Sequence, residues 1–434
     1  MKILKLILTS IFCLTTLFSY AQSLTTQLKK YDPYIQELNQ GIAVLVKHNG
    51  KTTTANSGNY NFDANTVFNI GSATKKMTAL LILQEVEKGT LKLSDSLGKY
   101  LQPIKNVNSS LTIETLLRHR SGLGEIVGKN FEKEFYAKND QFYDADFLRK
   151  IPENNPKEIG KYKYCNTNYI LLGHVLEKIT DKRYFDLLQE RIFTPCNMTS
   201  SYPYVSKNLK NLATPTHKQQ DVTSYLDYRF FANYAYAAGS VASTLNDITK
   251  FYSHLFEKKT LLSESSLKAF TTFDDANYGL GIMKFKDGYI GHGGNNLGYS
   301  YREYYNPENQ NLILLFSNSY AIPFSKMLKN ELFDFINGKT TTISFNENIV
   351  SDFKNVKGKY LFDSHGMKMD MEIIEHNNHL YFAAQGAKVI LVSTETNKLY
   401  NGSFGVELEV NPNNINELIF RQNGLETTLK RVKL

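Results

Sequence analysis

Hydrophobic and polar residues first predict a helix and a hairpin near the start of the chain. Residues 24–38 carry apolar positions at helical spacing. An apolar, β-branched run over residues 41–47 then stops at Asn49-Gly50, a dipeptide typical of tight hairpin turns. A second strand over residues 51–56 is therefore expected to pair with the first.

The next change of spacing places a serine at the start of a helix. Residues 66–70 read as a short strand end, and apolar residues then recur at helical spacing until Gly89, which favours a helix end. Ser72 is therefore expected at the N-terminus of a buried helix.

The middle of the chain is predominantly helical, and strands return after it. Between residues 91 and 260, helical spacing recurs around Tyr169–Ile179, Phe185–Ile192 and Leu245–Leu255. Strands are then predicted over residues 278–285, 289–292, 299–306 and 312–318, followed by a helix over 322–336. Strands near both chain ends, with helices between them, predict an α/β fold: an antiparallel sheet flanked by helices, with an all-helical insertion.

Beyond a polar hinge at residues 338–342, the pattern alternates with period two. Met367, Met369, Met371 and Ile373 would share one strand face, and Asn423-Gly424 marks another hairpin turn. Residues 341–434 are therefore predicted to form a small C-terminal all-β barrel or sandwich, separate from a domain over residues 22–338.

The N-terminus has the pattern of an export signal. In residues 1–21, two lysines precede an apolar stretch, and Ser19-Tyr20-Ala21 supplies small residues before a cleavage point. A membrane anchor is the alternative, but the stretch is shorter than the ~20 residues that span a bilayer. A lipid attached at Cys13 is disfavoured because Ile11 and Phe12 precede it. We predict cleavage after Ala21, a periplasmic or secreted protein, and no stable membrane insertion afterwards.

Composition and charge narrow the function classes. With 434 residues, 42% hydrophobic and 21% charged, the chain is a globular protein and neither disordered nor fibrous. A net charge of +8 without long runs of like charge does not indicate a nucleic-acid partner. Three cysteines are too few for a disulfide scaffold, and whether Cys165 and Cys196 pair is left open.

Ser72 and Lys75 form the first candidate catalytic pair. Three residues apart on a helix, their side chains lie on one face, where the helix N-terminus favours negative charge on the serine. The lysine can accept the serine proton if its pKa falls toward neutrality. The same Ser-x-x-Lys spacing occurs at Ser96, Ser265 and Ser351, but only Ser72 lies between a strand end and a buried helix.

Two further motifs complete the candidate site. Tyr164 and Asn166 precede a predicted helix and pair a proton-transferring phenol with an amide that can orient a substrate carbonyl. His292-Gly293-Gly294 lies on a predicted strand, where glycines let a substrate backbone approach closely. The alternative matches at Tyr304 and His48 fall beside hairpin turns.

In this order, the motifs resemble those of the penicillin-recognising serine hydrolases, a family that includes class C β-lactamases, D-alanyl-D-alanine carboxypeptidases, and related esterases and D-aminopeptidases. The resemblance covers roughly residues 25–337. It rests on five ordered blocks, at residues 68–72, 116–123, 164–169, 238–240 and 291–295.

The resemblance implies an acyl-enzyme mechanism that needs no cofactor and no metal. Ser72 would attack a carbonyl, with Lys75 and Tyr164 sharing the general-base and general-acid roles. The backbone N–H groups of Ser72 and Asn295 would hold the oxyanion.

The resemblance also implies roles in substrate binding. Asn166 would orient the substrate amide, and Gly294 of the strand motif would also belong to the substrate-binding site. His292 would support Tyr164 or bind a substrate carboxylate. Ser121-Gly122 would be a structural turn.

One departure from the family pattern bears on the substrate. Many relatives have Lys-Thr-Gly where this chain has His292-Gly293-Gly294, which weakens carboxylate recognition unless His292 is protonated, and argues against efficient β-lactam hydrolysis. Three hypotheses follow: a hydrolase of D-amino-acid or peptidoglycan-type amides, with β-lactam turnover as a side activity; a carboxylesterase; and a non-catalytic ligand sensor. The expected partner is a small-molecule or peptide substrate, including cell-wall peptide. The only close histidine pair, His376 and His379, flanks a hairpin tip and does not suggest a metal site.

Overall fold

The computed structural model describes residues 24–127, 147–320, 322–339, 344–364, 366–411 and 413–432. The expected leader, residues 1–21, lies outside the described residues. The chain divides into two compact units. One comprises Gln40–Asn56 and Tyr60–Tyr320; the other comprises Ser57–Asn59, Ala321–Leu434 and Met1–Asn39, each as far as described.

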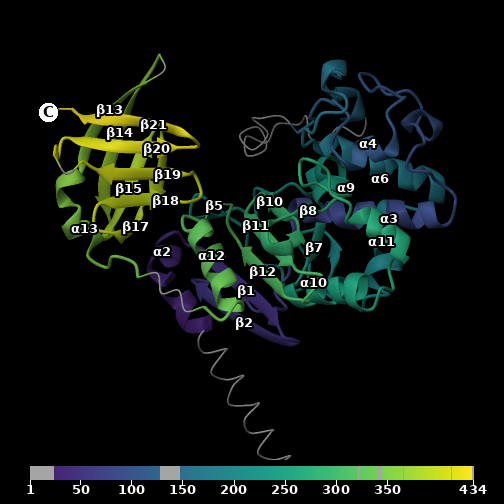
Figure 1. Ribbon diagram of the computed structural model, residues 1–434, viewed down its shortest axis with the longest axis horizontal. Helices are drawn as coiled ribbons and strands as arrows, with labels where there is room; N and C mark the ends of the chain where they lie inside the picture. Colours follow the sequence, from purple (N-terminus) through teal and green to yellow (C-terminus); the bar gives the residue numbers. More distant parts are fainter. Residues whose placement is uncertain are drawn as a thin grey trace, which may run out of the picture. The chain divides into compact units, whose positions relative to one another are not determined.

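An antiparallel sheet forms the centre of the first unit (Figure 1), with strand order β2-β1-β12-β11-β9-β8 and β10 paired to β11. Strand β1 pairs with β12 from Ile42 opposite Ser317 to Lys47 opposite Leu312, so the two ends of the domain meet in one sheet, as predicted. The bounds are β1 (Gly41–His48), β2 (Lys51–Gly58), β8 (Met283–Lys284), β9 (Ile290–Gly291), β10 (Gly293–Asn296), β11 (Tyr299–Tyr305) and β12 (Leu312–Ser317).

Helices and smaller sheets complete the first unit. One smaller sheet has the order β3 (Phe68–Asn69), β7 (Val241–Ser243) and β4 (Tyr202–Pro203), and another pairs β5 (Thr216–His217) with β6 (Gln220–Asp221). The helices include α3 (Thr74–Glu87), α4 (Ile113–Leu117), α6 (Asn166–Thr180), α7 (Tyr184–Leu188), α8 (Tyr228–Phe230), α9 (Tyr236–Gly239), α10 (Leu245–Tyr252) and α11 (Glu264–Phe270). Helix α10 begins as the sequence indicates, because the Thr244 side chain accepts a hydrogen bond from the N–H of Asp247.

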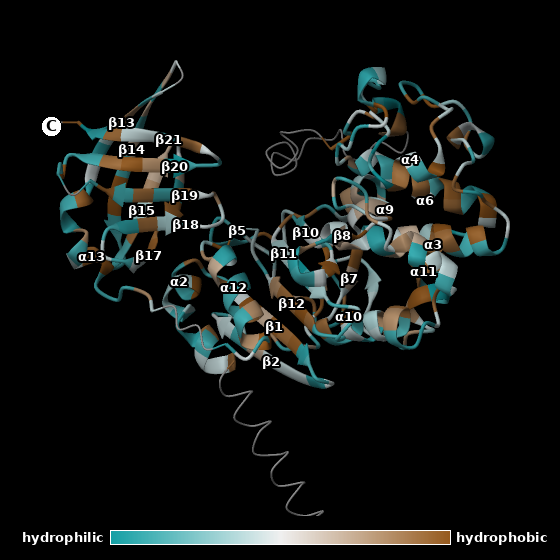
Figure 2. Cartoon of the chain, viewed as in Figure 1, coloured by the Kyte–Doolittle hydropathy of each residue, from teal (hydrophilic) through white to brown (hydrophobic). Residues whose placement is uncertain are grey.

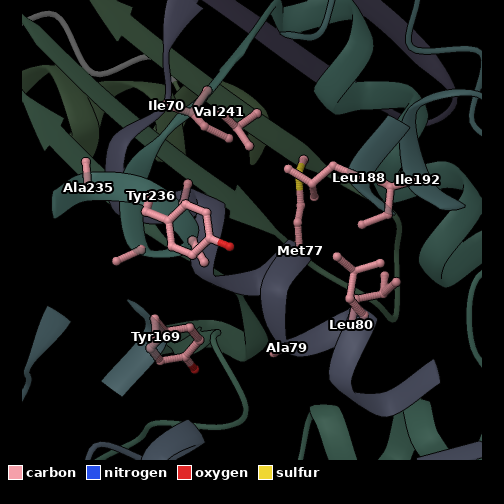
Figure 3. Packing of buried hydrophobic residues seen from close by; sticks show 14 of the residues in the cluster. Ile70, Met77, Ala79, Leu80, Tyr169, Leu188, Ile192, Ala235, Tyr236 and Val241 are labelled. Atoms are coloured by element: carbon pink, nitrogen blue, oxygen red, sulfur yellow. The ribbon is translucent and has the colours of Figure 1, made fainter. Parts of the chain in front are cut away.

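The core of this unit joins the helices to the sheets. Strands β1 and β12 are largely hydrophobic (Figure 2), and all six residues of β12 are buried. Figure 3 shows Met77 and Leu80 of α3 with Leu188 and Ile192, members of one buried cluster. Every residue of α3 from Thr74 to Leu83 is buried, so the helix that follows Ser72 is held on all sides.

One predicted strand is shorter than expected, and one predicted helix is interrupted. The segment expected as a strand over residues 278–285 forms strand only at Met283–Lys284. Gly281 has φ +74° and packs against the Lys75 carbonyl oxygen, so the chain turns there. The helix expected over residues 24–38 is interrupted at Tyr31, and its second half, α2 (Asp32–Glu37), begins with Pro33 in its first turn.

The second unit contains an all-β sheet, as predicted, whose strands follow the order β16-β15-β14-β13-β21-β20-β19-β18-β17 and form a nearly closed barrel. In β14, the buried residues Met371 and Ile373 alternate with more exposed neighbours, which confirms the period-two pattern. The bounds are β13 (Gly358–Ser364), β14 (Met367–His376), β15 (His379–Ala384), β16 (Ala387–Ile390), β17 (Val392–Glu395), β18 (Lys398–Asn401), β19 (Val406–Val410), β20 (Glu417–Gln422) and β21 (Leu425–Arg431).

Helices α2, α12 (Ser325–Ile336) and α13 (Ile349–Asp352) belong to this second unit. Both α2 and α12 fall within the domain predicted over residues 22–338, and that domain boundary stays a prediction. Among the described residues, no helix combines the length and apolar character needed to cross a bilayer.

A fully buried ion pair ties α3 to the central sheet. Lys76 Nζ donates to both carboxylate oxygens of Glu303 on β11, at 2.8 and 2.7 Å, and both side chains are 0% exposed. Glu303 also accepts hydrogen bonds from the Tyr301 hydroxyl at 2.7 Å and from the His292 backbone N–H at 3.0 Å. One carboxylate thus connects the helix after Ser72 to His292, which lies between β9 and β10 and not within the strand predicted over residues 289–292.

We predict that Glu303→Gln lowers the free energy of unfolding by about 3–5 kcal/mol, because it leaves the buried Lys76 charge without a counter-charge. Urea denaturation measures this change. Asp186→Asn removes an exposed pair with Arg183 and should cost at most about 1 kcal/mol. A Glu303→Gln protein as stable as the Asp186→Asn control would contradict the prediction.

Candidate active site

Ser72 lies in a tight connection between a strand and a helix. Strand β3 leads into a 3₁₀ turn, η1 (Gly71–Ala73), and then into α3. Gly71 adopts φ +51°, and its N–H donates to the Asn69 side chain at 2.8 Å, which shapes the turn. The strand-to-helix connection is as predicted, and it places Ser72 within the 3₁₀ turn, two residues before Thr74, where α3 begins.

Lys75 lies beside Ser72, as its spacing predicts. Its Nζ is 3.2 Å from the Ser72 hydroxyl oxygen and donates to Asn166 Oδ1 and to the Ala238 carbonyl oxygen, each at 2.8 Å. A neutral amine has two N–H groups and one lone pair. Because Asn166 Oδ1 and the Ala238 carbonyl can only accept, they take both N–H groups and leave the lone pair for Ser72.

The surroundings of Lys75 favour this neutral form. Burial lowers the pKa of Lys75 to about 7, although the charge of Glu125 acts in the opposite direction. The Tyr164 and Tyr169 rings, whose centroids lie 4.9 and 5.6 Å from Nζ, also favour the charged form, but the effect of burial is larger. A substantial fraction of the amine is therefore unprotonated at neutral pH.

Tyr164 lies next to this amine, two residues before α6. The residue is 37% exposed, yet desolvation of its phenol raises its pKa well above the usual value, while a hydrogen bond with Ser72 acts against this rise. The phenol consequently keeps its proton at neutral pH, whereas the lysine titrates there. The sequence left open which of Lys75 and Tyr164 holds a proton at rest. Their different environments favour a protonated phenol and a partly neutral amine.

The strand β10 lies directly against the turn at Ser72. A Cβ atom at Gly294 would overlap the Ile70 carbonyl oxygen and lie 2.9 Å from the Ser72 backbone nitrogen. One at Gly71 would lie 3.0 Å from the Asn295 backbone nitrogen. The two amides expected to bind an oxyanion therefore belong to segments in direct backbone contact. Gly294 is buried and allows this approach, whereas Asn295 is exposed.

His292 takes part in a hydrogen-bonded chain that the sequence analysis did not predict. Its Nε2 lies 3.2 Å from the Tyr278 hydroxyl, which lies 3.1 Å from His119 Nε2. His119 Nδ1 accepts from the Cys165 backbone N–H and faces the Asn168 side-chain nitrogen, both at 3.1 Å. This hydrogen-bonded chain runs from the segment that carries Tyr164 and Asn166 to His292, between β9 and β10.

The known donors and acceptors fix the direction of each hydrogen bond between His119, Tyr278 and His292. Since Nδ1 of His119 accepts, its Nε2 carries the proton and donates to Tyr278. The Tyr278 hydroxyl then donates to His292 Nε2, and His292 Nδ1 donates to the Gly293 carbonyl oxygen. Burial lowers the pKa of His292 to about 3 and that of His119 well below its usual value, so both rings are neutral. With both ring nitrogens engaged, His292 has no free proton for a substrate carboxylate.

The structure also shows the state of the two cysteines, of Ser121 and of groups that could bind a metal. Cys165 and Cys196 are both free and buried. Ser121 is a structural residue of its turn: its hydroxyl donates to Asn168 Oδ1 at 2.6 Å and accepts from the Leu123 N–H at 3.1 Å. Among the described residues, no group of three or more His, Cys, Asp or Glu side chains could hold a metal ion.

Three residues near the site were missed: His119, Tyr278 and Glu125. His119 lies in the block at residues 116–123 that resembles the family, but its position in the sequence does not by itself indicate a chemical role. Tyr278 lies in a segment whose pattern predicts a strand. Glu125 is a charged residue that follows Gly124 between the apolar residues Leu123 and Ile126, which is the sequence feature that indicates it.

The chain is similar in sequence to known proteins. Residues 32–332 match the model of the family described as Beta-lactamase. PbpX of Bacillus subtilis (strain 168), whose name describes a penicillin-binding protein, is 24% identical over 318 residues, which cover 71% of this chain and 78% of PbpX. The teichoic acid D-alanine hydrolase of Staphylococcus aureus (strain MRSA252) is 28% identical over 239 residues, 53% of this chain and 58% of that protein's length.

Solved structures share the fold. The octameric penicillin-binding protein homologue from Pyrococcus abyssi has a TM-score of 0.59 and 21% identity, and the match covers 95% of this chain and 100% of that one. The D-amino acid amidase from Ochrobactrum anthropi SV3 has a TM-score of 0.58 and 21% identity over 74% of this chain and 98% of that one. The expected resemblance to penicillin-recognising serine hydrolases and the expected fold class are both confirmed.

We predict that Gly294→Ala lowers the kcat/KM of any reaction at Ser72 by about 10²-fold, because β10 must move away from Ile70 and displace one of the two amides. Gly239→Ala is the matched control: it is also a buried glycine near the site, but its Cβ would have no neighbour closer than 3.5 Å. Steady-state kinetics and melting temperatures of both variants measure the effect. Equal activities in the two variants would refute the role given to this backbone contact.

Proposed function

Because the chain belongs to the Beta-lactamase family, we propose that it is a serine hydrolase that acts through an acyl-enzyme on Ser72. The observation that carries this proposal is the set of contacts of Lys75 Nζ, which leaves its lone pair directed at the Ser72 hydroxyl. A non-catalytic ligand sensor would not need such an arrangement.

In the proposed acylation, the neutral Lys75 amine takes the Ser72 proton while the serine oxygen bonds to the substrate carbonyl carbon. The backbone N–H groups of Ser72 and Asn295 stabilise the oxyanion. When the intermediate collapses, the bond to the leaving nitrogen or oxygen breaks and Tyr164 gives that atom its proton. The Lys75 ammonium then returns a proton to Tyr164. Water enters, and the same groups release the acyl chain and restore the Ser72 hydroxyl.

We propose D-amino-acid and peptidoglycan-type amides as the substrate class. The names of the matched proteins support this class, since they include a D-amino acid amidase and a teichoic acid D-alanine hydrolase. Asn166 has an amide nitrogen suited to the substrate carbonyl. Penicillins are the related scaffold to test, although the replacement of Lys-Thr by His292-Gly293 argues against efficient turnover.

A carboxylesterase is the second candidate, and the state of His292 favours it. A neutral imidazole with both nitrogens engaged provides no cation for a substrate carboxylate. Esters and amides without a carboxylate on the leaving group would meet no such requirement. Export, cleavage after Ala21 and a periplasmic or secreted location remain part of the proposal and rest on the pattern of residues 1–21.

The proposal is tested by intact-mass spectrometry of the purified protein with a fluorophosphonate and, separately, a penicillin, followed by peptide mapping. We expect the fluorophosphonate to add to Ser72 and not to a Ser72→Ala variant. Penicillin adduct and release of D-alanine from D-alanyl amides would support the amidase, and turnover of short acyl nitrophenyl esters alone would support the esterase. Absence of any adduct at Ser72 would overturn the proposed hydrolase.

The pKa of Lys75 predicts the pH dependence. Below pH about 7 the amine is protonated and cannot accept the Ser72 proton, so kcat/KM should fall as the pH drops through that value. Above it, the rate should level off, because the raised pKa of Tyr164 keeps the phenol protonated. Lys75→Arg should reduce kcat/KM by about 10²–10⁴-fold, since a guanidinium stays charged. A profile flat from pH 5 to 9 would contradict Lys75 as the base.

A further inference from the structure

We propose that Glu125 is a positioning residue of this site: its carboxylate holds the Asn166 side chain in the orientation that directs Oδ1 at Lys75, and places a negative charge behind that amide. The inference rests on the proposed function of Ser72 and Lys75. It concerns a residue that neither the motifs nor the hydrophobic pattern identified.

The geometry begins at the first residue of α6. Glu125 Oε2 accepts hydrogen bonds from the Asn166 backbone N–H at 2.7 Å and from Asn166 Nδ2 at 3.1 Å, while Oε1 accepts from the Val127 N–H at 3.0 Å. A backbone N–H in the first turn of a helix has no partner within that helix, and a carboxylate there also complements the helix dipole. Glu125 thus anchors the start of α6 and the Asn166 side chain together.

The carboxylate decides which way the Asn166 amide points. An ionised carboxylate only accepts hydrogen bonds, so the NH₂ end must face Glu125 and the oxygen must face Lys75 Nζ, 2.8 Å away. The reverse orientation would set the amide oxygen against the carboxylate and the NH₂ against the lysine N–H groups. One hydrogen of the NH₂ is used on Glu125, and the second is left for a substrate carbonyl.

The charge of Glu125 also acts on Lys75. The other groups around the amine are uncharged near pH 7: His119 and His292 have lowered pKa values, burial raises the pKa of the Cys165 thiol to about 11, and the Tyr164 and Tyr169 phenols are protonated. Within the described part of the chain, Glu125 is the acidic group whose charge chiefly opposes the effect of burial on Lys75. Burial raises the pKa of Glu125 itself, and its hydrogen bonds from Asn166 and Val127 favour its ionised form.

The orienting hydrogen bond and the charge of Glu125 can be separated by two substitutions, which are expected to give different pH profiles. Glu125→Gln keeps the shape but removes the charge, so the acidic limb of the kcat/KM profile should move down by about 1 pH unit. Its rate on the plateau should also fall about tenfold, since the Asn166 amide loses its acceptor-only partner. Glu125→Asp keeps the charge on a shorter side chain, so the limb should stay near its original pH while the plateau falls.

The experiment measures two quantities on each purified full-length protein. One is the rate of fluorophosphonate labelling at Ser72 against pH. The other is an NMR titration of ¹³Cε-labelled lysine, with Lys75 assigned from Lys75→Arg, which does not require activity. Glu264→Gln is the control, a carboxylate-to-amide change at an exposed position on α11. It should leave both titrations unchanged.

The outcomes separate the two proposals. A downward shift of both titrations in Glu125→Gln, absent in Glu264→Gln, is the expected result. If Glu125→Gln only lowers the melting temperature and the Lys75 titration stays in place, Glu125 is a structural residue and the inference is overturned. If the unmodified protein is not labelled at Ser72, the proposed function fails, while the NMR titration still decides whether Glu125 acts on Lys75.

Discussion

Burial of the Lys75 amine is the constraint on which the site depends. An amine removed from water must either lose its charge or find compensating groups, and here its neighbours are mainly dipoles: the Asn166 amide, the Ala238 carbonyl and the Ser72 hydroxyl. These groups come from α6, α9 and the 3₁₀ turn η1, respectively. The requirement to satisfy one nitrogen thus brings together segments that are far apart in the sequence.

Lys76, the next residue along α3, keeps its charge in the buried environment. Lys76 is equally buried, but it meets the Glu303 carboxylate directly and is stabilised as an ion pair. Adjacent lysines on one helix therefore differ in chemistry because their partners differ: Lys76 secures α3 to β11, while Lys75 titrates near neutral pH. Glu125 acts on Lys75 through the Asn166 amide, so its charge opposes burial without forming an ion pair.

Much of the fold could be predicted because its signals are local. The hairpin at Asn49-Gly50, the period-two strands of the C-terminal sheet and the helix after Ser72 follow from turn chemistry and hydrophobic spacing. The secondary structure differs from the prediction where a contact with a distant segment determines the local backbone conformation. Gly281 turns against the Lys75 carbonyl, and so the strand expected over residues 278–285 is reduced to two residues.

For the site, the sequence by itself determined which residue types are available, namely Ser72, Lys75, Tyr164, Asn166 and His292, and their family resemblance. Only the tertiary structure decided their protonation and orientation. His292 is neutral because burial removes water from its ring, and a hydrogen-bond chain through Tyr278 to the distant His119 fixes which ring nitrogen carries the proton. The pKa of Lys75 falls because burial removes water from the amine. Desolvation and hydrogen-bond direction are properties of packed neighbours in three dimensions, and spacing along a chain does not encode them.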